Sequence, residues 1–340
     1  MQVKYTNFRV LVALFTLAVA LGGSNVAVAS ESFDALFASG SPGGNWAQIA
    51  TMLSDQCQKN IPNFTYTTFP GGGATNPILV ARGDANMGMT FLTNLSDIMG
   101  GKEQYHEEFP NGATNLRSLT KLGLTSWAYI VITGDIARKY NVSTFKDLID
   151  NKAQMRMNVG QVGQGDEQFS RRLLGYYGLT YEDITSWGGQ VTYSPNSDAI
   201  DRFVNGAQTN TLLFVERLGL AEVIELFASR ECVLVPLDQD ALDYLGSTYS
   251  YMVGTAPANT FKGQTEEIKM AYLEYCVFTN DTMPEEIAYG ITKSILTGKE
   301  EFIKTNVAFE AFEPAIAYRD MAAPLHPGAE RAFKELGYMK

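Results

Sequence analysis

This chain alternates strand-like and helix-like segments, and glycine-rich turns join strands to the helices that follow them. The first unit is a strand at 33–39, a turn at 40–44 and a helix at 46–59. A strand at 64–69 leads through a second turn into a helix that starts near Asn76. Repetition of strand, turn and helix predicts an α/β fold with a mainly parallel sheet, in which ligands bind beyond the carboxyl ends of the strands.

Further segments continue this alternation. We expect a mostly helical C-terminal part, helices at 169–177 and 197–205, and strands at 85–91, 127–133, 155–160, 211–215 and 233–236. The chain has 340 residues, whereas one hydrophobic core rarely grows beyond about 250–300 residues. Two lobes are therefore expected, and the lack of a flexible linker indicates that strands cross between them. We assign residues 30–131 plus 279–340 to lobe 1 and 132–278 to lobe 2, with crossing strands at 127–133 and 275–279.

The N-terminus has the pattern of a targeting segment. Lys4 and Arg9 accompany an apolar run at 10–21, and Ala27-Val28-Ala29 supplies the small residues that signal peptidase reads. This order predicts a secretory signal peptide over residues 1–29, cleaved after Ala29. An uncleaved membrane anchor is the alternative, but a membrane span needs about 20 apolar residues. We therefore expect export across the inner membrane and a periplasmic location.

The composition argues against several function classes. The formal net charge is −11, which argues against a nucleic-acid partner because such a protein needs a basic surface to displace phosphate counterions. Three cysteines and two histidines, with no CxxC pair, leave few ligands for a metal site, and we expect neither metal nor cofactor. Cys57, Cys232 and Cys276 are interpreted as buried free thiols, although export would permit one disulfide.

Motifs of catalysis are also missing from the sequence. The run most similar to a nucleophile elbow has Ser39 where that motif needs its first glycine, and neither a phosphate loop nor a dinucleotide fingerprint occurs. His106 lies in an acidic loop and His326 in a rigid turn, and both are expected at the surface. We therefore expect no catalytic residue and no enzyme activity. An exported hydrolase that uses a carboxylate pair stays an alternative, because 37 acidic residues are spread along the chain.

Three glycine-rich turns point to a binding function. They span 41–45, 70–75 and 163–166, and a helix is expected after each. The first N–H groups of a helix lack partners and carry a partial positive charge, and glycine lets a ligand approach the backbone closely. Such turns bind carboxylate or phosphate oxygens without lysine or arginine. One such turn alone is better explained as a tight connection, but three turns in both halves of an exported protein favour a binding cleft.

These segments resemble a family of transport receptors. The chain is similar to the TAXI-type solute receptors of the tripartite ATP-independent periplasmic (TRAP) transporters. The resemblance covers nearly all of the chain after residue 29 and rests on segments in the order of that family, at 39–46, 71–76, 83–89, 159–166 and the closing block Pro324-Leu325-His326-Pro327-Gly328-Ala329-Glu330-Arg331. It implies two α/β lobes of the type II periplasmic-binding-protein architecture around a ligand cleft. It also implies capture of a small organic acid or amino acid, often a dicarboxylate, and delivery to a permease driven by an ion gradient.

The predicted ligand site combines the three turns with aromatic and acidic residues. Amides of Gly72, Gly73 and Thr75 are expected to hold ligand oxygens from one lobe, and Gln164 and Gly165 are expected to reach the ligand when the other lobe closes. Four aromatic residues are candidates for apolar walls, with burial in the core as the alternative: Trp46, Phe91, Trp127 and Phe214. The whole predicted set is Ser41, Gly43, Asn45, Trp46, Gly72, Gly73, Ala74, Thr75, Phe91, Trp127, Gly163, Gln164, Gly165, Asp166, Phe214 and Glu216.

Two acidic residues depart from the pattern of the resembled family, which has neutral residues there. Asp166 has an alternative role as a helix N-cap, and Glu216 has an alternative position in solvent. If either faces the cleft, its charge opposes a simple anion and suits an amino group or hydroxyls instead. We expect a monomer whose partners are a small-molecule ligand and TRAP permease subunits. A ligand-binding sensor subunit that signals to a membrane partner is left open.

Overall fold

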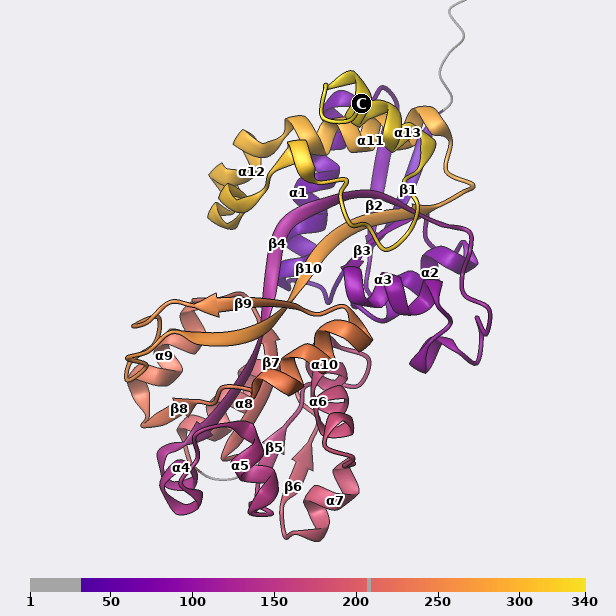
Figure 1. The fold of residues 1–340 in the computed structure, drawn as a ribbon. Helices are drawn as coiled ribbons and strands as arrows, with labels where there is room; N and C mark the ends of the chain where they lie inside the picture. Colours follow the sequence, from indigo (N-terminus) through magenta and orange to yellow (C-terminus); the bar gives the residue numbers. More distant parts are fainter. Residues whose placement is uncertain (1–31, 207–208) are drawn as a thin grey trace, which may run out of the picture. The chain divides into compact units, whose positions relative to one another are not determined.

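Two long strands organise the fold. β4 (Leu116–Thr133) and β10 (Ile268–Asn280) pair antiparallel with each other in the middle of a ten-stranded sheet. The strand order is β2-β1-β3-β10-β4-β7-β5-β6, while β8 pairs with β4 and β9 pairs with β10. Figure 1 shows β4 and β10 extending from the region of β1–β3 to the region of β5–β9. The segments expected to cross, 127–133 and 275–279, lie within these two strands.

The computed structural model describes residues 32–206 and 209–340, and residues 32–340 form one compact unit. The predicted signal peptide at 1–29 lies outside the described residues. Within the described ranges, no helix is both long and apolar enough to cross a membrane.

The first lobe is built around three parallel strands. β1 (Phe33–Ala38) pairs with both β2 (Phe64–Phe69) and β3 (Met87–Phe91). The helices between them are α1 (Asn45–Asn60) and α2 (Thr75–Arg82), and α3 (Leu92–Met99) and a short 3₁₀ helix η1 (Glu103–Tyr105) follow β3. The C-terminal segments α11 (Glu285–Thr297), α12 (Lys299–Thr305), η2 (Val307–Ala311), η3 (Pro314–Ile316) and α13 (Pro327–Glu335) complete this lobe, where α11 packs against α1 and α13.

The second lobe is built around β7 (Thr211–Glu216), β5 (Arg156–Asn158) and β6 (Gln190–Thr192), which are also parallel. Its helices are α4 (Gly134–Tyr140), α5 (Phe145–Asp150), α6 (Gly165–Tyr176), α7 (Tyr181–Ser186), α8 (Asn196–Val204), α9 (Ala221–Ser229) and α10 (Gln239–Tyr249). The short strands β8 (Cys232–Leu234) and β9 (Met252–Ala256) extend the sheet beside β4 and β10. The residue boundaries expected for the two lobes stay a prediction.

The prediction of a mainly parallel sheet is wrong. The three central strands of each lobe are parallel, but β10 is antiparallel to β3, β4 and β9, and β4 is antiparallel to β7 and β8. The reason is that the chain passes from the first lobe to the second through β4 and returns through β10, so these strands run in opposite directions. Burial along β4 reflects the crossing: positions 121–127 alternate between partly exposed and buried, whereas 128–133 are all buried.

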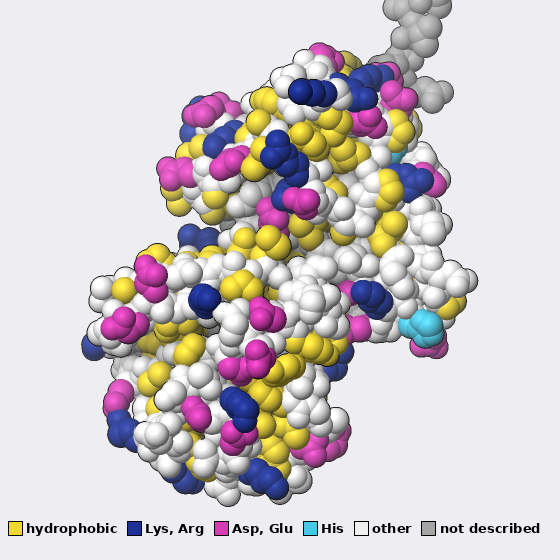
Figure 2. Space-filling model, viewed as in Figure 1, with side chains coloured by type: hydrophobic (Ala, Val, Ile, Leu, Met, Phe, Trp, Pro, Cys, Tyr) yellow, Lys and Arg dark blue, Asp and Glu magenta, His cyan; other side chains and the backbone are white. Residues whose placement is uncertain are grey.

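The surface carries charges of both signs. On the face shown in Figure 2, Lys and Arg side chains are interspersed with Asp and Glu over both lobes. The largest hydrophobic cluster includes Phe37, Phe91 and Val277 of the first lobe together with Phe169 and Leu213 of the second. The core therefore continues from one lobe into the other along the sheet.

Candidate ligand-binding site

The first residues of α1, α6 and α8 and the glycine turn before α2 line one cavity of about 230 Å³. α1 and the turn before α2 belong to the first lobe, and α6 and α8 belong to the second. Ten of the predicted residues line this cavity: Ser41, Asn45, Trp46, Gly72, Gly73, Phe91, Gln164, Gly165, Asp166 and Glu216. Seven further lining residues were not predicted: Gly40, Gly44, Gly71, Ser126, Asn196, Val215 and Tyr275. The other six predicted residues lie outside the lining: Gly43, Ala74, Thr75, Trp127, Gly163 and Phe214.

The first turn leads into α1 by a tight backbone bend. Gly44 precedes the helix, and its N–H donates to the Ser41 carbonyl at 3.0 Å. Gly43 has φ of +78°, which L side chains rarely adopt, so this position needs glycine for the turn itself. Gly44 has no side chain to cap α1, which leaves the helix's first amides, at Asn45 and Trp46, beside the cavity.

A buried asparagine holds the second turn. The Asn76 side chain donates to the carbonyls of Ser39 and Met89, both at 2.7 Å, and to Ala38 at 3.1 Å. Its oxygen accepts the Gly72 N–H at 3.0 Å. Asn76 was not among the predicted site residues, because its role depends on carbonyl groups far away in the sequence.

Two backbone N–H groups that were predicted to hold the ligand already have hydrogen-bond partners within the protein. The Gly72 N–H is bound to Asn76, and the Thr75 N–H donates to the Gly72 carbonyl at 3.1 Å. Neither group is therefore free to hold ligand oxygens as expected. Within the described residues, the Gly73 N–H has no hydrogen-bond partner, and Gly73 lines the cavity.

The third turn brings the second lobe to the cavity. Gln164 precedes α6, and Gly165 and Asp166 are its first two residues. Gly163 has φ of +83° and lies just outside the lining. A Cβ atom added to Gly72 would lie 3.8 Å from the Gly163 carbonyl oxygen, so the second and third turns face each other closely.

Three aromatic rings form the apolar wall. Trp46, Phe91 and Tyr275 have ring centroids 5.0–5.1 Å apart in all three pairs. The Trp46 Nε1–H donates to the Tyr275 hydroxyl at 3.0 Å, and that hydroxyl also bonds Ser126 Oγ at 2.7 Å. Tyr275 and Ser126 lie on the crossing strands β10 and β4. Tyr275 lies on the predicted crossing strand 275–279, which was the one signal for it, whereas Ser126 lies one residue before the predicted strand 127–133.

Two predicted wall residues, Phe214 and Trp127, pack outside the cavity lining instead. Phe214 stacks on Tyr129 with ring centroids 4.9 Å apart, in a buried cluster of the second lobe. Side chains alternate between the faces of a strand, so Val215 faces the cavity and Phe214 does not. Trp127 stacks on Tyr272 at 5.0 Å, also outside the lining. Phe214 matches the alternative of core packing, whereas Trp127 is partly exposed at the edge of the same cluster.

Two carboxyl groups give the cavity its electrostatic character. Asp166 is 6% exposed, accepts the Val215 N–H, and follows the N-cap Gln164, so it is not itself the N-cap. Burial, aided by the charge of Glu216, raises the pKa of Asp166 to about 7. The Asn196 amide donates to Glu216 Oε1 at 3.2 Å, which acts to lower the pKa of Glu216. Burial outweighs this hydrogen bond and leaves the pKa of Glu216 raised. The lining contains no Lys or Arg.

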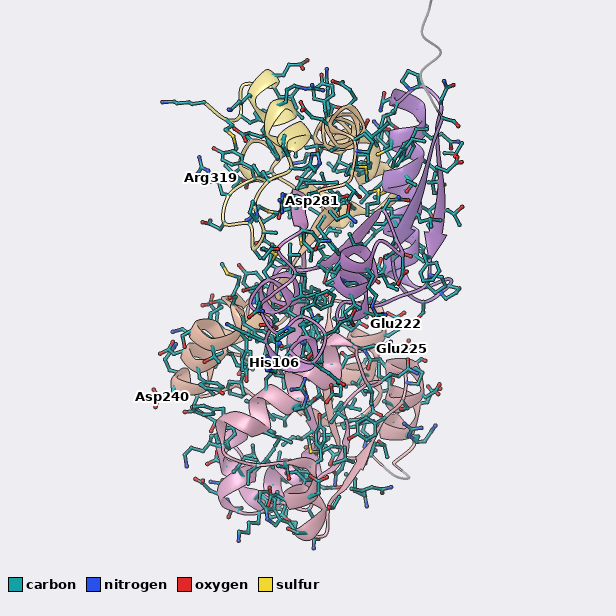
Figure 3. All side chains as sticks on the ribbon, turned by 90° about the vertical axis from the view of Figure 1, so that its right-hand side faces the viewer. His106, Glu222, Glu225, Asp240, Asp281 and Arg319 are labelled. Atoms are coloured by element: carbon teal, nitrogen blue, oxygen red, sulfur yellow. The ribbon has the colours of Figure 1, made fainter. Side chains whose placement is uncertain are left out.

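The histidines and cysteines lie away from this cavity. His106 is exposed, as expected, and Figure 3 labels it. The surface prediction is wrong for His326, which is 3% exposed and caps α13: its Nδ1 accepts the Gly328 N–H at 3.1 Å. All three cysteines are free thiols, with Cys57 and Cys276 buried and Cys232 partly exposed. Among residues 32–206 and 209–340, no group of three or more His, Cys, Asp or Glu side chains is arranged to hold a metal ion.

The fold consists of two α/β lobes beside one cavity, to which both lobes contribute residues. MatC from Rhodopseudomonas palustris with bound malate is similar, with a TM-score of 0.50 at 8% identity over 89% of this chain and 97% of that chain. A Xanthomonas citri protein bound to ATP has a TM-score of 0.49 at 10% identity, over 89% and 95% of the chains. The alkanesulfonate-binding protein SsuA from Xanthomonas axonopodis pv. citri, bound to MOPS, has a TM-score of 0.43 at 14% identity, over 91% and 92%. At 8% identity, the likeness to MatC shows a shared fold alone.

The sequence of the chain also matches a family model. The family model described as the NMT1-like family matches residues 37–337, which is most of the chain. The chain belongs to the NMT1-like family.

Proposed function

We propose that this protein is an extracytoplasmic solute receptor that captures a small organic acid or amino acid and delivers it to an ion-gradient-driven TRAP permease. The observation that carries the proposal is that the N-termini of α1, α6 and α8 and the glycine turn before α2 meet, from both lobes, at one cavity whose lining has no Lys or Arg. Helix N-termini attract anionic groups through free N–H donors and the helix dipole. In this proposal the ligand is bound and released without chemical change.

The backbone amides supply the anion subsite. A ligand carboxylate docks on the Gly73 N–H and the first amides of α1, and the α6 turn completes the contacts. The rings of Trp46, Phe91 and Tyr275 pack against the carbon skeleton of the ligand. Closure is favoured because only the closed form joins contacts from both lobes.

Asp166 and Glu216 favour an amino acid over a dicarboxylate. Both carboxyl groups line the cavity and both have raised pKa values from burial, so each gains from a nearby cation. A protonated amino group supplies that cation, whereas a second ligand carboxylate adds repulsion. The ligand that fits this lining best has one anionic group and one amino group.

The permease type rests on the resemblance to TAXI-type receptors, chiefly the closing block at 324–331. Export by a cleaved signal peptide and a periplasmic location belong to the same proposal. The mass of the protein purified from the periplasm tests the cleavage after Ala29. Uptake of the bound ligand into proteoliposomes that contain the permease, under an ion gradient and without ATP, tests the transport step.

A thermal-shift screen tests the ligand. Amino acids are compared with the 2-oxo acids of the same carbon skeleton, for example L-alanine with pyruvate and L-glutamate with 2-oxoglutarate. Ligand at 100 times its Kd stabilises the folded protein by about 2.7 kcal/mol. We expect Gly73→Leu to abolish the shift, because a Cβ at Gly73 already lies 3.2 Å from the Phe91 ring. Gly175→Leu is the matched control, since a Cβ there meets nothing within 4 Å. A shift that survives Gly73→Leu places the ligand elsewhere.

A further inference from the structure

A polar seam joins the two lobes behind the cavity. It consists of Asn94 and Asp97 on α3 and Gln168 and Arg172 on α6, and each of these residues is at most 2% exposed. Asn94 Nδ2 donates to Gln168 Oε1 at 3.0 Å, and the Arg172 guanidinium donates to the Asp97 carboxylate. No part of the ligand-binding proposal uses these four side chains.

The seam is continuous with the cavity. Phe91 immediately precedes α3, Gly165 is the first residue of α6, and both line the cavity. A Cβ added to Gly165 would lie 3.2 Å from the Phe91 ring, so the start of α6 lies close to the residue before α3. The pair Asn94–Gln168 and the pair Asp97–Arg172 follow about one helical turn apart. In Figure 1, α10 lies between α3 and α6, and it packs against both.

The charges of the seam are compensated across the lobes. Glu103 of η1 accepts from Arg172 Nη2 at 2.9 Å, and the Arg172 guanidinium lies 4.3 Å above the Tyr249 ring. Burial raises the pKa of Asp97 despite Arg172. Burial also acts to raise the pKa of Glu103, but Arg172 and Arg171 outweigh it and leave that pKa lowered. Arg172 of the second lobe is therefore balanced by carboxylates that both come from the first lobe.

The hydrogen bonding of the seam is incomplete. Asp97 Oδ1, Gln168 Nε2 and Arg172 Nη1 are buried without a partner among the described residues. A buried polar atom without a partner costs about 1–3 kcal/mol, and water would satisfy these atoms if the lobes separated. Desolvation of the ion pair opposes closure in the same way. The seam thus combines specific contacts between the lobes with a penalty that keeps those contacts reversible.

We propose that this seam is the latch that sets the balance between open and closed lobes, and that Arg172 is the positioning residue that holds the start of α6 against the cavity. The inference rests on the proposed receptor function, in which the lobes move. In this proposal the seam residues do not touch the ligand, but they determine the fraction of molecules in the closed, binding-competent form. A ligand binds more weakly when the competent form is less populated.

The latch is tested by measuring distances between the two lobes in the full-length mature protein without ligand. Spin labels at Lys59→Cys on α1 and Glu182→Cys on α7, both exposed, report the separation by pulsed electron resonance in a Cys232→Ser background. Arg172→Met is expected to add a longer distance population. Arg138→Met is the matched control, because Arg138 is ion-paired with Asp135 and Glu231 within the second lobe, and it is expected to leave the distances unchanged.

A second variant moves the balance in the opposite direction. Asn94→Leu with Gln168→Leu removes the buried amides and their penalty, and it is expected to sharpen the short-distance population. This variant also keeps the test valid if Arg172→Met does not fold. Identical distances in the wild type and the folded seam variants overturn the latch. These measurements need no ligand, so a failed ligand screen counts against the receptor function and leaves the latch to its own test.

Discussion

The Asp166 carboxyl of α6 accepts a hydrogen bond from the backbone N–H of Val215 on β7. This contact joins the third glycine turn to the strand beside it, and α6 packs against β7. It places an acidic group, 6% exposed, in the wall of the cavity next to Glu216. The same contact has measurable consequences for stability and for ligand choice.

Stability is expected to fall with rising pH because of Asp166. Its pKa is about 7 in the folded protein against an ordinary value of 3.8, so the folded state binds the proton more tightly. Stability is therefore lost as pH rises from 3.8 through 7, and Glu216, also raised, acts in the same direction. Asp166→Asn removes this loss. We therefore compare the free energy of unfolding of the variant with that of the wild type at each pH, and we expect the variant's advantage to be about 2–3 kcal/mol larger at pH 8 than at pH 5.

Urea unfolding at the two pH values measures this difference. Asp198→Asn on α8 is the control, because Asp198 is exposed and lies outside the cavity lining. Equal gains for Asp166→Asn at both pH values would show that Asp166 is ionised normally in the folded protein.

Asp166→Asn also decides between ligand classes. A ligand with an amino group is expected to lose at least tenfold in affinity, because the anionic partner of that group is gone. An anionic ligand without an amino group is expected to bind as well or better, since a repulsive charge is removed. Calorimetric titration with both members of a matched pair, such as L-glutamate and 2-oxoglutarate, measures the two changes. An amino acid that binds the variant undiminished has its amino group elsewhere.

Much of the local fold could be predicted because it is encoded locally. The strand at 64–69 was predicted to the residue, and 33–39 and 211–215 to within one residue, since apolar and β-branched runs end there in turns or glycines. The antiparallel pairing of β4 and β10 could not be predicted in this way. Their register joins Trp127 to Tyr272, residues far apart in the sequence, and polar positions such as Lys121 interrupt the apolar pattern of β4.

In the candidate site, too, the locally encoded residues could be predicted and the residues that depend on long-range contacts could not. The glycine turns were predictable because a turn and the helix after it are consecutive in the chain. Tyr275, Ser126 and Asn196 were missed because they reach the cavity only through strand register and lobe placement. Arg172 and Asp97 are 75 residues apart, and no local motif marks either residue.

Asn76→Ala is expected to destabilise the protein by about 2–4 kcal/mol. The change leaves the Gly72 N–H and the carbonyls of Ser39 and Met89 without their partner in a buried place. Urea unfolding gives the loss, and Asn60→Ala serves as control because Asn60 is exposed and bonds only its own helix at Gln56. A loss no larger than that of the control would mean that the turn is held by its backbone alone.

Tyr275→Phe tests the hydroxyl at the centre of the aromatic wall. The change removes the acceptor of Trp46 Nε1–H and the partner of Ser126, so we expect a loss of about 1 kcal/mol in stability and weaker ligand binding. Tyr272→Phe on the same strand is the matched control, because Tyr272 stacks on Trp127 outside the cavity. Thermal shifts with and without the best ligand of the screen separate the two effects. Equal behaviour of the two variants would remove Tyr275 from the binding wall and leave the ligand to the backbone amides.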